Sequence, residues 1–367
     1  MQRRTLLAWT AMGLLSGCAG RSGMTLAGAR TGQFGLASGG RNASADNLLL
    51  SGLLSSPQSQ PVSGRLHAGA QRPGGDELVM VERRPGCRAL VIDLRNGQLV
   101  QVLEAGPGLH FYGHAVFSAD GRELYATANH IDSGQGRILV FDAVHRYRPL
   151  RIMPSGGMDP HELRLMPDKQ TLAIAHGGIR THPDFARIKL NLASMQPNLT
   201  LLDPETGQVV QQHHPSHHQL SCHHLDVSPD GIVMVGYQFE GPSWLSPPLM
   251  GRLDAATGQF SEPHVPEVEL ALLANYIASV AINPLSGLAL VTAPKGNQLA
   301  LFDYHAGRFV GLLPFPDGGG ALPSARGFVV SSGLGGLYRV LPGAQPELLG
   351  GEDFCWDNHL TALDLPI

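Results

Sequence analysis

Residues 89–97, ALVIDLRNG, hold the pattern that decides the fold: an apolar run, an aspartate and a turn that contains glycine. Versions of this pattern return at residues 138–143 (ILVFDA), 199–207 (LTLLDPETG), 252–258 (RLDAATG) and 299–307 (LALFDYHAG). An apolar run that ends in an aspartate and a tight turn is typical of a buried strand entering a hairpin. Its return along the chain predicts a repeated all-β domain.

A second pattern alternates with the first. Apolar strands that end in a turn occur at residues 116–121 (VFSADG), 165–168 (LMPD), 227–231 (VSPDG) and 282–287 (INPLSG), and a short strand follows each. Together the two patterns indicate about four strands in roughly 45 residues, which is the period of a propeller blade. The sequence therefore predicts a seven-bladed β-propeller of the WD40/YVTN-like kind, with few helices. A pair of β-sandwiches is the alternative.

The ends of the chain are predicted to close the ring together. Six units begin near these residues: His67, His114, His161, His224, Ser279 and Pro323. Residues 354–363 resemble the first strand of a seventh blade, so its other strands must come from the N-terminal side, around residues 47–54. Only residues 55–64 remain for two outer strands, so we expect this closing blade to be truncated.

The first residues carry export signals. Arg3 and Arg4 precede an apolar stretch at residues 6–15, which at about ten residues is too short to span a bilayer. The tetrad at residues 15–18, LSGC, matches a bacterial lipobox, whose cysteine is acylated after cleavage. Residues 1–17 are therefore predicted to be a signal peptide, and Cys18 the lipidated residue of a periplasmic lipoprotein held to the membrane by its lipid alone. The paired arginines favour twin-arginine export, with an ordinary Sec signal as the alternative.

Composition sets the remaining boundaries. Residues 18–46 are rich in glycine, serine and alanine and are predicted to form a flexible tether, so that the propeller domain spans residues 47–367. A net charge of −4, with 15% charged residues, indicates no basic face, so a nucleic acid is not an expected partner.

Several motifs together resemble one family. They are residues 111–121 (FYGHAVFSADG), 160–163 (PHEL), 177–192 (GGIRTHPDFARIKLNL), 218–226 (HQLSCHHLD), 275–282 (NYIASVAI) and 356–360 (WDNHL). From about Asn47 to its end, the chain resembles the family of bacterial exported proteins called domain of unknown function 1513. The resemblance implies a propeller in the cell envelope, with imelysin-like or di-haem-oxidoreductase-like proteins of iron-responsive gene clusters as partners. It implies no catalytic residue.

The placement of the histidines suggests a site. Of the seventeen histidines, His67, His114 and His161 follow one another at intervals of 47 residues. His223 or His224, and His359, hold the matching place in their own blades. The innermost strand of each blade lines the axial channel, so equivalent positions of successive blades converge. The predicted metal ligands are His67, His114, His161, His223, His224 and His359, with Glu162 and Asp357 as further donors.

Histidines that converge from successive blades suit an ion of iron, copper or zinc, because imidazole nitrogen is a good ligand for all three. Two other interpretations stay open from the residues alone. Each histidine could instead hydrogen-bond to the adjacent blade and stabilise strand packing, or the group could transfer protons, since histidine titrates near neutral pH.

The third blade contains an insertion, residues 177–198. It carries five polar candidates for partner binding, namely Arg180, His182, Asp184, Arg187 and Lys189. Loops of this length with no strand of their own are often functional, so the insertion could be a lid or a docking surface, or a plain stabilising loop.

Known catalytic motifs are absent from the sequence: it contains no Gly-x-Ser-x-Gly, no Cys-x-x-Cys-His, no His-Glu-x-x-His and no phosphate loop. The leading hypothesis is a non-enzymatic accessory protein of envelope metal handling, with iron as the expected metal. A scaffold for protein interactions is the second hypothesis. A metal-dependent hydrolase or oxidoreductase is the third.

Overall fold

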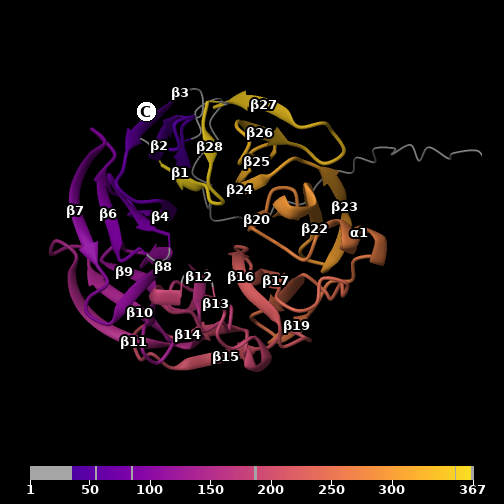
Figure 1. Ribbon diagram of the computed structural model, residues 1–367, viewed down its shortest axis with the longest axis horizontal. Coiled ribbons are helices and arrows are strands. Elements are labelled where there is room, and N and C mark those ends of the chain that lie inside the picture. The colour runs from indigo at the N-terminus through magenta and orange to yellow at the C-terminus, as the bar shows by residue number, and fades with distance from the viewer. Residues whose placement is uncertain (1–34, 54–55, 84–85, 186–187, 352, 365–367) are drawn as a thin grey trace, which may run out of the picture.

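The computed structural model describes residues 35–53, 56–83, 86–185, 188–351 and 353–364. The predicted signal peptide and Cys18 lie outside these residues. The described chain forms seven antiparallel sheets arranged in a ring, as Figure 1 shows. The predicted seven-bladed propeller is confirmed.

Six blades have four strands each, in sequence order. The first contains β4 (Leu66–Gln71), β5 (Glu77–Glu82), β6 (Arg88–Asp93) and β7 (Gln98–Glu104), and the second contains β8 (Leu109–Phe117), β9 (Glu123–His130), β10 (Gln135–Asp142) and β11 (Arg148–Met158). The third contains β12 (Pro160–Leu165), β13 (Leu172–His176), β14 (Asn198–Leu202) and β15 (Val209–His213). The fourth contains β16 (Leu220–Val227), β17 (Ile232–Phe239), β18 (Met250–Asp254) and β19 (Gln259–Ser261). The fifth contains β20 (Ser279–Asn283), β21 (Leu288–Ala293), β22 (Gln298–Asp303) and β23 (Arg308–Pro314). The sixth contains β24 (Gly318–Ser324), β25 (Gly327–Ser332), β26 (Leu337–Val340) and β27 (Glu347–Gly350).

The innermost strands contact one another in order around the axis, from β4 to β8, β12, β16, β20 and β24. Figure 1 shows them around the centre of the ring, with β7, β11, β15 and β23 at the rim. Apolar side chains of neighbouring blades pack between the sheets; the largest fully buried ones include Tyr237 and Phe302. Burial of these faces is the main stabilising contribution to the ring.

The repeated aspartate has a structural role in the turn after the third strand of a blade. In the first blade, Asp93 Oδ1 accepts a hydrogen bond from the Arg95 N–H at 2.9 Å. In the third, Asp203 Oδ1 accepts one from the Glu205 N–H at 2.8 Å. The turn then ends on a glycine with φ near +70°, such as Gly97, a conformation that strains other residues. The repeat visible in the sequence is therefore a strand followed by a turn stabilised by the aspartate side chain.

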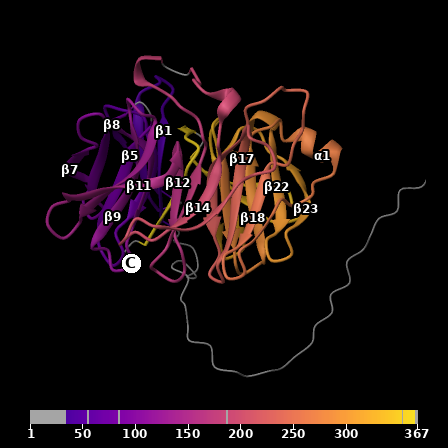
Figure 2. The same cartoon turned by 90° about the horizontal axis from the view of Figure 1, so that it is seen from below.

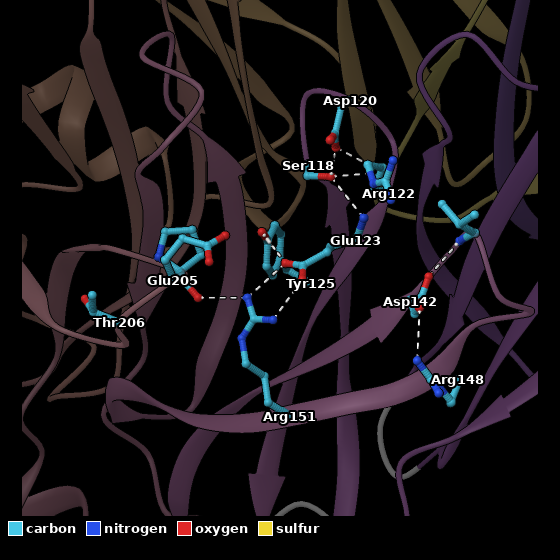
Figure 3. Close-up of polar contacts among 12 residues, drawn as sticks. Ser118, Asp120, Arg122, Glu123, Tyr125, Asp142, Arg148, Arg151, Glu205 and Thr206 are labelled. Carbon is cyan, nitrogen blue, oxygen red and sulfur yellow. Dashed lines mark hydrogen bonds and ion pairs between the residues drawn. The ribbon is translucent and has the colours of Figure 1, made fainter.

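Polar contacts tie neighbouring blades together near the rim (Figure 3). Arg151 of β11 binds Glu123 of β9 at 2.8 Å and also donates to the carbonyl oxygen of Pro204 in the next blade at 3.0 Å. The hydrogen bond from Arg151 lowers the pKa of Glu123, which keeps this carboxylate charged. The second and third blades are thus joined by a charged contact as well as by apolar packing.

The seventh blade is formed by both ends of the described chain. It contains five strands: β28 (Cys355–Trp356) and β29 (Thr361–Leu363) from the C-terminal side, then β1 (Gly35–Arg41), β2 (Asn47–Leu53) and β3 (Ser56–Pro61) from the N-terminal side. Closure by both ends is confirmed, but the prediction of a truncated blade is wrong.

The strand β1 lies inside the segment predicted to be a tether, so the propeller includes residues upstream of position 47. All but the last residue of β1 are buried, although none except Leu36 is bulky. A side chain at Gly39 would come within 2.8 Å of the Leu66 carbonyl oxygen. A small residue is therefore needed at Gly39, where β1 passes close to the first blade, so glycine in this segment reflects packing and not only flexibility.

Helices are few in the described chain. They are one short α-helix, α1 (Glu267–Leu272), and the 3₁₀ turns η1 (Pro183–Phe185), η2 (Leu192–Ser194) and η3 (Pro294–Gly296). Among the described residues, no helix has the length and apolar character needed to cross a bilayer.

Candidate metal centre

The predicted histidines come from neighbouring blades. His67 is on β4, His114 on β8, His161 on β12, and His223 and His224 are on β16. His359 lies between β28 and β29 of the closing blade. The strands β4, β8, β12 and β16 lie next to one another along one part of the central channel in Figure 1.

The imidazole rings converge. His359 lies 4.4 Å from His67, 4.6 Å from His114 and 4.7 Å from His224, measured between ring centroids. One ligand atom from each of His67, His114, His161 and His359 can be chosen so that all four lie within 4.8 Å of one another. A second set with the same property contains His114, Glu162, His224 and His359. We call the residues of these two sets the histidine cluster: His67, His114, His161, His224, His359 and Glu162.

Irregularities in the innermost strands accompany the histidines. Each of β4, β8 and β12 shifts register against its neighbour, between Leu66 and Gly69, Phe111 and Ala115, and Pro160 and Leu163, respectively. Such bulges turn a side chain away from its regular direction. In β8 the bulge contains Gly113, whose φ is +106°, and a Cβ there would lie 2.3 Å from Cδ2 of His67. Only glycine leaves room for the His67 ring at this point.

Three imidazoles of the histidine cluster are buried with an unused nitrogen. His67, His114 and His359 are 4%, 4% and 6% exposed. Nδ1 of His67 and Nε2 of both His114 and His359 have no hydrogen-bond partner. A buried polar atom without a protein partner is costly in a folded protein, so these nitrogens are open to an ion, a ligand or a water molecule.

The surroundings keep these imidazoles neutral. Burial lowers the pKa values of His67, His114, His161 and His359 well below the usual 6.5, and repulsion from the neighbouring histidines lowers them further. The neutral form is the one that binds a metal ion. The histidine cluster therefore presents neutral donors at physiological pH without having to release protons.

Glu162 lies between two histidines of the cluster and an arginine. Its carboxylate lies 3.1 Å from Nδ1 of His224 and 3.9 Å from Nδ1 of His114, and it binds Arg164 at 2.8 Å. A carboxylate that accepts a hydrogen bond from one imidazole nitrogen directs the other nitrogen towards the metal. Of the two histidines, His224 is within hydrogen-bonding distance of the carboxylate. We interpret Glu162 as a residue that positions His224, and it stays a candidate ligand because a carboxylate oxygen of Glu162 belongs to the second set.

Two further predicted ligands lie outside both sets. Asp357 is buried, but its carboxylate binds Arg65 at 2.6 Å and Arg83 at 3.1 Å, so its charge is already offset. His223 packs edge-on against His161, with ring centroids 4.4 Å apart, and its Nδ1 lies 3.3 Å from the Ser221 carbonyl oxygen. The structure thus places both residues beside the histidine cluster, with other partners.

Sequence reasoning missed Arg164 and His176. Arg164 stands two residues after Glu162 on β12, and alternate residues of a strand share a face, so the spacing was a usable signal. His176 had no such signal, because its partner is Ser155 of the second blade, whose Oγ lies 3.0 Å from its Nε2. Burial lowers the pKa of His176 to about 3.

An axial cavity of about 900 Å³ leads to the histidine cluster. His114, His359 and Glu162 form part of its wall. Its apolar wall includes Ala281 and Leu322. The cavity connects the histidine cluster with the face of the ring where the innermost strands end, because it also contains the residues that follow β4.

The insertion at residues 177–198 is tied to the propeller by some of the residues predicted to bind a partner. Arg180 donates to the Asp132 carbonyl oxygen at 2.8 Å, and Lys189 forms an ion pair with Glu240. His182 lies 3.6 Å from Asp184, whose side chain is 82% exposed, and Arg187 lies outside the described residues. Figure 2 shows the insertion rising above one side of the ring.

Comparison with known proteins identifies the fold and the family. The family model described as "Protein of unknown function (DUF1513)" matches residues 60–363. Hydrazine synthase of Kuenenia stuttgartiensis has a similar fold: the match covers 78% of this chain and 86% of that one, with 15% sequence identity and a TM-score of 0.58. Similarity at that identity concerns the fold alone. No curated protein matches the chain in sequence.

Proposed function

Because the chain belongs to the DUF1513 family, whose description states no activity, we propose a function from its own residues. The protein binds one transition-metal ion in the histidine cluster and serves as an accessory of metal handling in the cell envelope. The observation that carries this proposal is the meeting of four neutral imidazoles from four blades, with ligand atoms within 4.8 Å of one another. Three of them have a buried nitrogen without a partner.

The donor set limits the metal. Imidazole binds iron, copper and zinc well, whereas calcium and magnesium prefer oxygen. Metal–nitrogen bonds near 2 Å require ligand atoms roughly 3 Å apart, so the histidine cluster would close slightly around an ion. We expect iron, because the sequence resembles exported proteins of iron-responsive gene clusters. Imelysin-like or di-haem-oxidoreductase-like proteins are the proposed partners.

Metal titration tests the proposal. The full chain, stripped with a chelator, is titrated with Fe²⁺ under anaerobic conditions and separately with Cu²⁺ and Zn²⁺, and bound metal is counted by elemental analysis. We expect one ion per chain. The double variant His114→Ala/His161→Ala should bind at least a hundredfold more weakly. The matched control is His145→Ala/His305→Ala, because these side chains are 68% and 55% exposed and remote from the axis. No binding of any of the three metals, or equal binding by the two double variants, would contradict the proposal.

The location of the protein in the cell is part of the same proposal. We propose that Arg3 and Arg4 direct export of the protein to the periplasm and that Cys18 carries the lipid that holds it to the membrane. Cys18→Ser should abolish incorporation of labelled fatty acid and release the protein from the membrane fraction. Replacement of both arginines by lysine should block export only if the twin-arginine route is used. Retention of the lipid label by Cys18→Ser would contradict the assignment.

An interaction scaffold is the second candidate, because the insertion exposes apolar side chains. Phe185 and Ile188 are 50% and 58% exposed, and Trp244 of a nearby loop is 81% exposed. Exposed apolar patches often mark binding surfaces. Capture of envelope proteins by the wild type, but not by Phe185→Ser/Ile188→Ser, would favour the scaffold, and identical captures would argue against it. An enzymatic role, as a metal-dependent hydrolase or oxidoreductase, would require activity that depends on added metal and disappears in His161→Ala.

A further inference from the structure

The charged side chains that face the histidine cluster form two groups. On one side, Arg164 binds Glu162 at 2.8 Å and lies 3.8 Å from Asp226. On the other side, Asp357 binds both Arg65 and Arg83. The first group carries at most one net negative charge, and the second carries one net positive charge. Together they are close to neutral.

A metal ion in the histidine cluster would therefore keep its own charge. Four neutral imidazoles donate electron pairs but carry no charge, and Glu162 is already offset by Arg164. A divalent ion would leave about two positive charges uncompensated among buried side chains, which is costly. The two other carboxylates of these groups are already included in this balance, because Asp226 lies 3.8 Å from Arg164 and Asp357 binds two arginines. An anion from outside the chain would relieve this imbalance.

The axial cavity offers the path and the space for such an anion. Its volume of about 900 Å³ is in the range of small-molecule sites and far exceeds the need of a hydroxide. It reaches the histidine cluster at His114 and His359. Its two arginines are both held by carboxylates, Arg72 by Glu77 at 2.9 Å and Arg164 by Glu162. Neither arginine is therefore available as the main anchor for an anion, and the bound metal is the remaining positive group.

We propose that the axial cavity takes a small organic carboxylate, which binds through its oxygen to the metal ion held by the histidine cluster and lays its apolar part against the wall formed by residues such as Ala281 and Leu322. This proposal rests on the metal site proposed above. It assigns the cavity to a ligand class: monoanions with an apolar body. The metal and the carboxylate would thus be bound together, and each would strengthen the binding of the other.

Cobalt spectroscopy tests the proposal. The full chain is loaded with Co²⁺ in a non-coordinating sulfonate buffer, and its visible d–d absorption is recorded during titration with acetate and then benzoate. Both should shift the spectrum with saturation, and benzoate should bind at least tenfold more tightly than acetate. Ala362→Trp should narrow the mouth of the cavity, because Ala362 lines it and is exposed, and should weaken benzoate binding at least tenfold. The control is Ala344→Trp, an exposed alanine that does not line the cavity.

The outcomes separate the two proposals. Absence of protein-dependent d–d bands would overturn the metal site and the carboxylate site with it. Bands that carboxylates leave unchanged, or that respond only to pH, would overturn the carboxylate site and leave the metal site standing. Equal binding of benzoate to the metal-free protein would also overturn it, because the metal would not be the anchor. Equal benzoate affinity in the two tryptophan variants would remove the axial cavity as the binding site.

Discussion

Replacing Gly113 by alanine should disturb the histidine cluster although no predicted ligand is itself replaced. Gly113 is buried in the bulge of β8, and its φ of +106° is unfavourable for a residue with a side chain. The added Cβ would lie 2.3 Å from Cδ2 and 3.0 Å from Cγ of His67. The His67 ring would have to move, because the contact is with its near end and not with a flexible tip.

Two contributions set the size of the effect. The backbone conformation costs about 1–3 kcal/mol for a residue other than glycine. Overpacking against the imidazole adds about 1–3 kcal/mol. Gly106→Ala isolates the first contribution, since Gly106 has a similar φ of +92° and no atom within 4 Å of the added Cβ. We expect Gly113→Ala to lower the free energy of unfolding by about 1–3 kcal/mol more than Gly106→Ala does.

The assay is urea denaturation followed by tryptophan fluorescence, together with zinc titration of each variant. Gly113→Ala should bind zinc at least tenfold more weakly than Gly106→Ala. In the His67→Ala background, Gly113→Ala should lose most of its packing cost, which a double-mutant cycle measures as coupling energy. Equal destabilisation by the two glycine substitutions, with equal zinc affinity and no coupling, would refute the placement of the His67 ring beside Gly113.

Three further outcomes follow from the contacts. Glu162→Gln should keep the fold but lower metal affinity roughly 10–100-fold, measured by competition with a chelating dye, because the amide orients His224 less well; unchanged affinity would count against a positioning role. Because the pKa of His176 is lowered to about 3, the unfolded chain binds a proton below pH 6.5 that the folded chain does not. The free energy of unfolding should therefore fall by about 2 kcal/mol between pH 7 and pH 5 on account of this residue, and His176→Gln should show a correspondingly smaller loss in urea midpoints; the same pH dependence in both proteins would contradict the assignment. Phe302→Ala should lower the free energy of unfolding by about 3–5 kcal/mol, since the ring is fully buried between blades; a cost below about 1 kcal/mol in urea denaturation would argue against this packing.

Part of this protein could be predicted from the sequence because a repeat converts spacing along the chain into position around an axis. His67, His114 and His161 lie 47 residues apart, about one blade, so a closed ring brings them to the same level of the channel. The turns after the repeated aspartate, and the closing blade formed by both ends of the chain, could be predicted for the same reason. These features depend on local pattern and period alone.

Tertiary structure decided the features that depend on residues distant in sequence. Arg65 pairs with Asp357 across 292 positions, which removes a carboxylate that the sequence had offered as a ligand. The strand β1 has the composition of a tether, and only its close approach to Leu66 explains the glycine at position 39. The role of Glu162 likewise follows from Arg164 and His224 standing on either side of it. Period and pattern specify which backbone positions meet, whereas the charge and the free volume at a meeting point depend on every chain segment that reaches it.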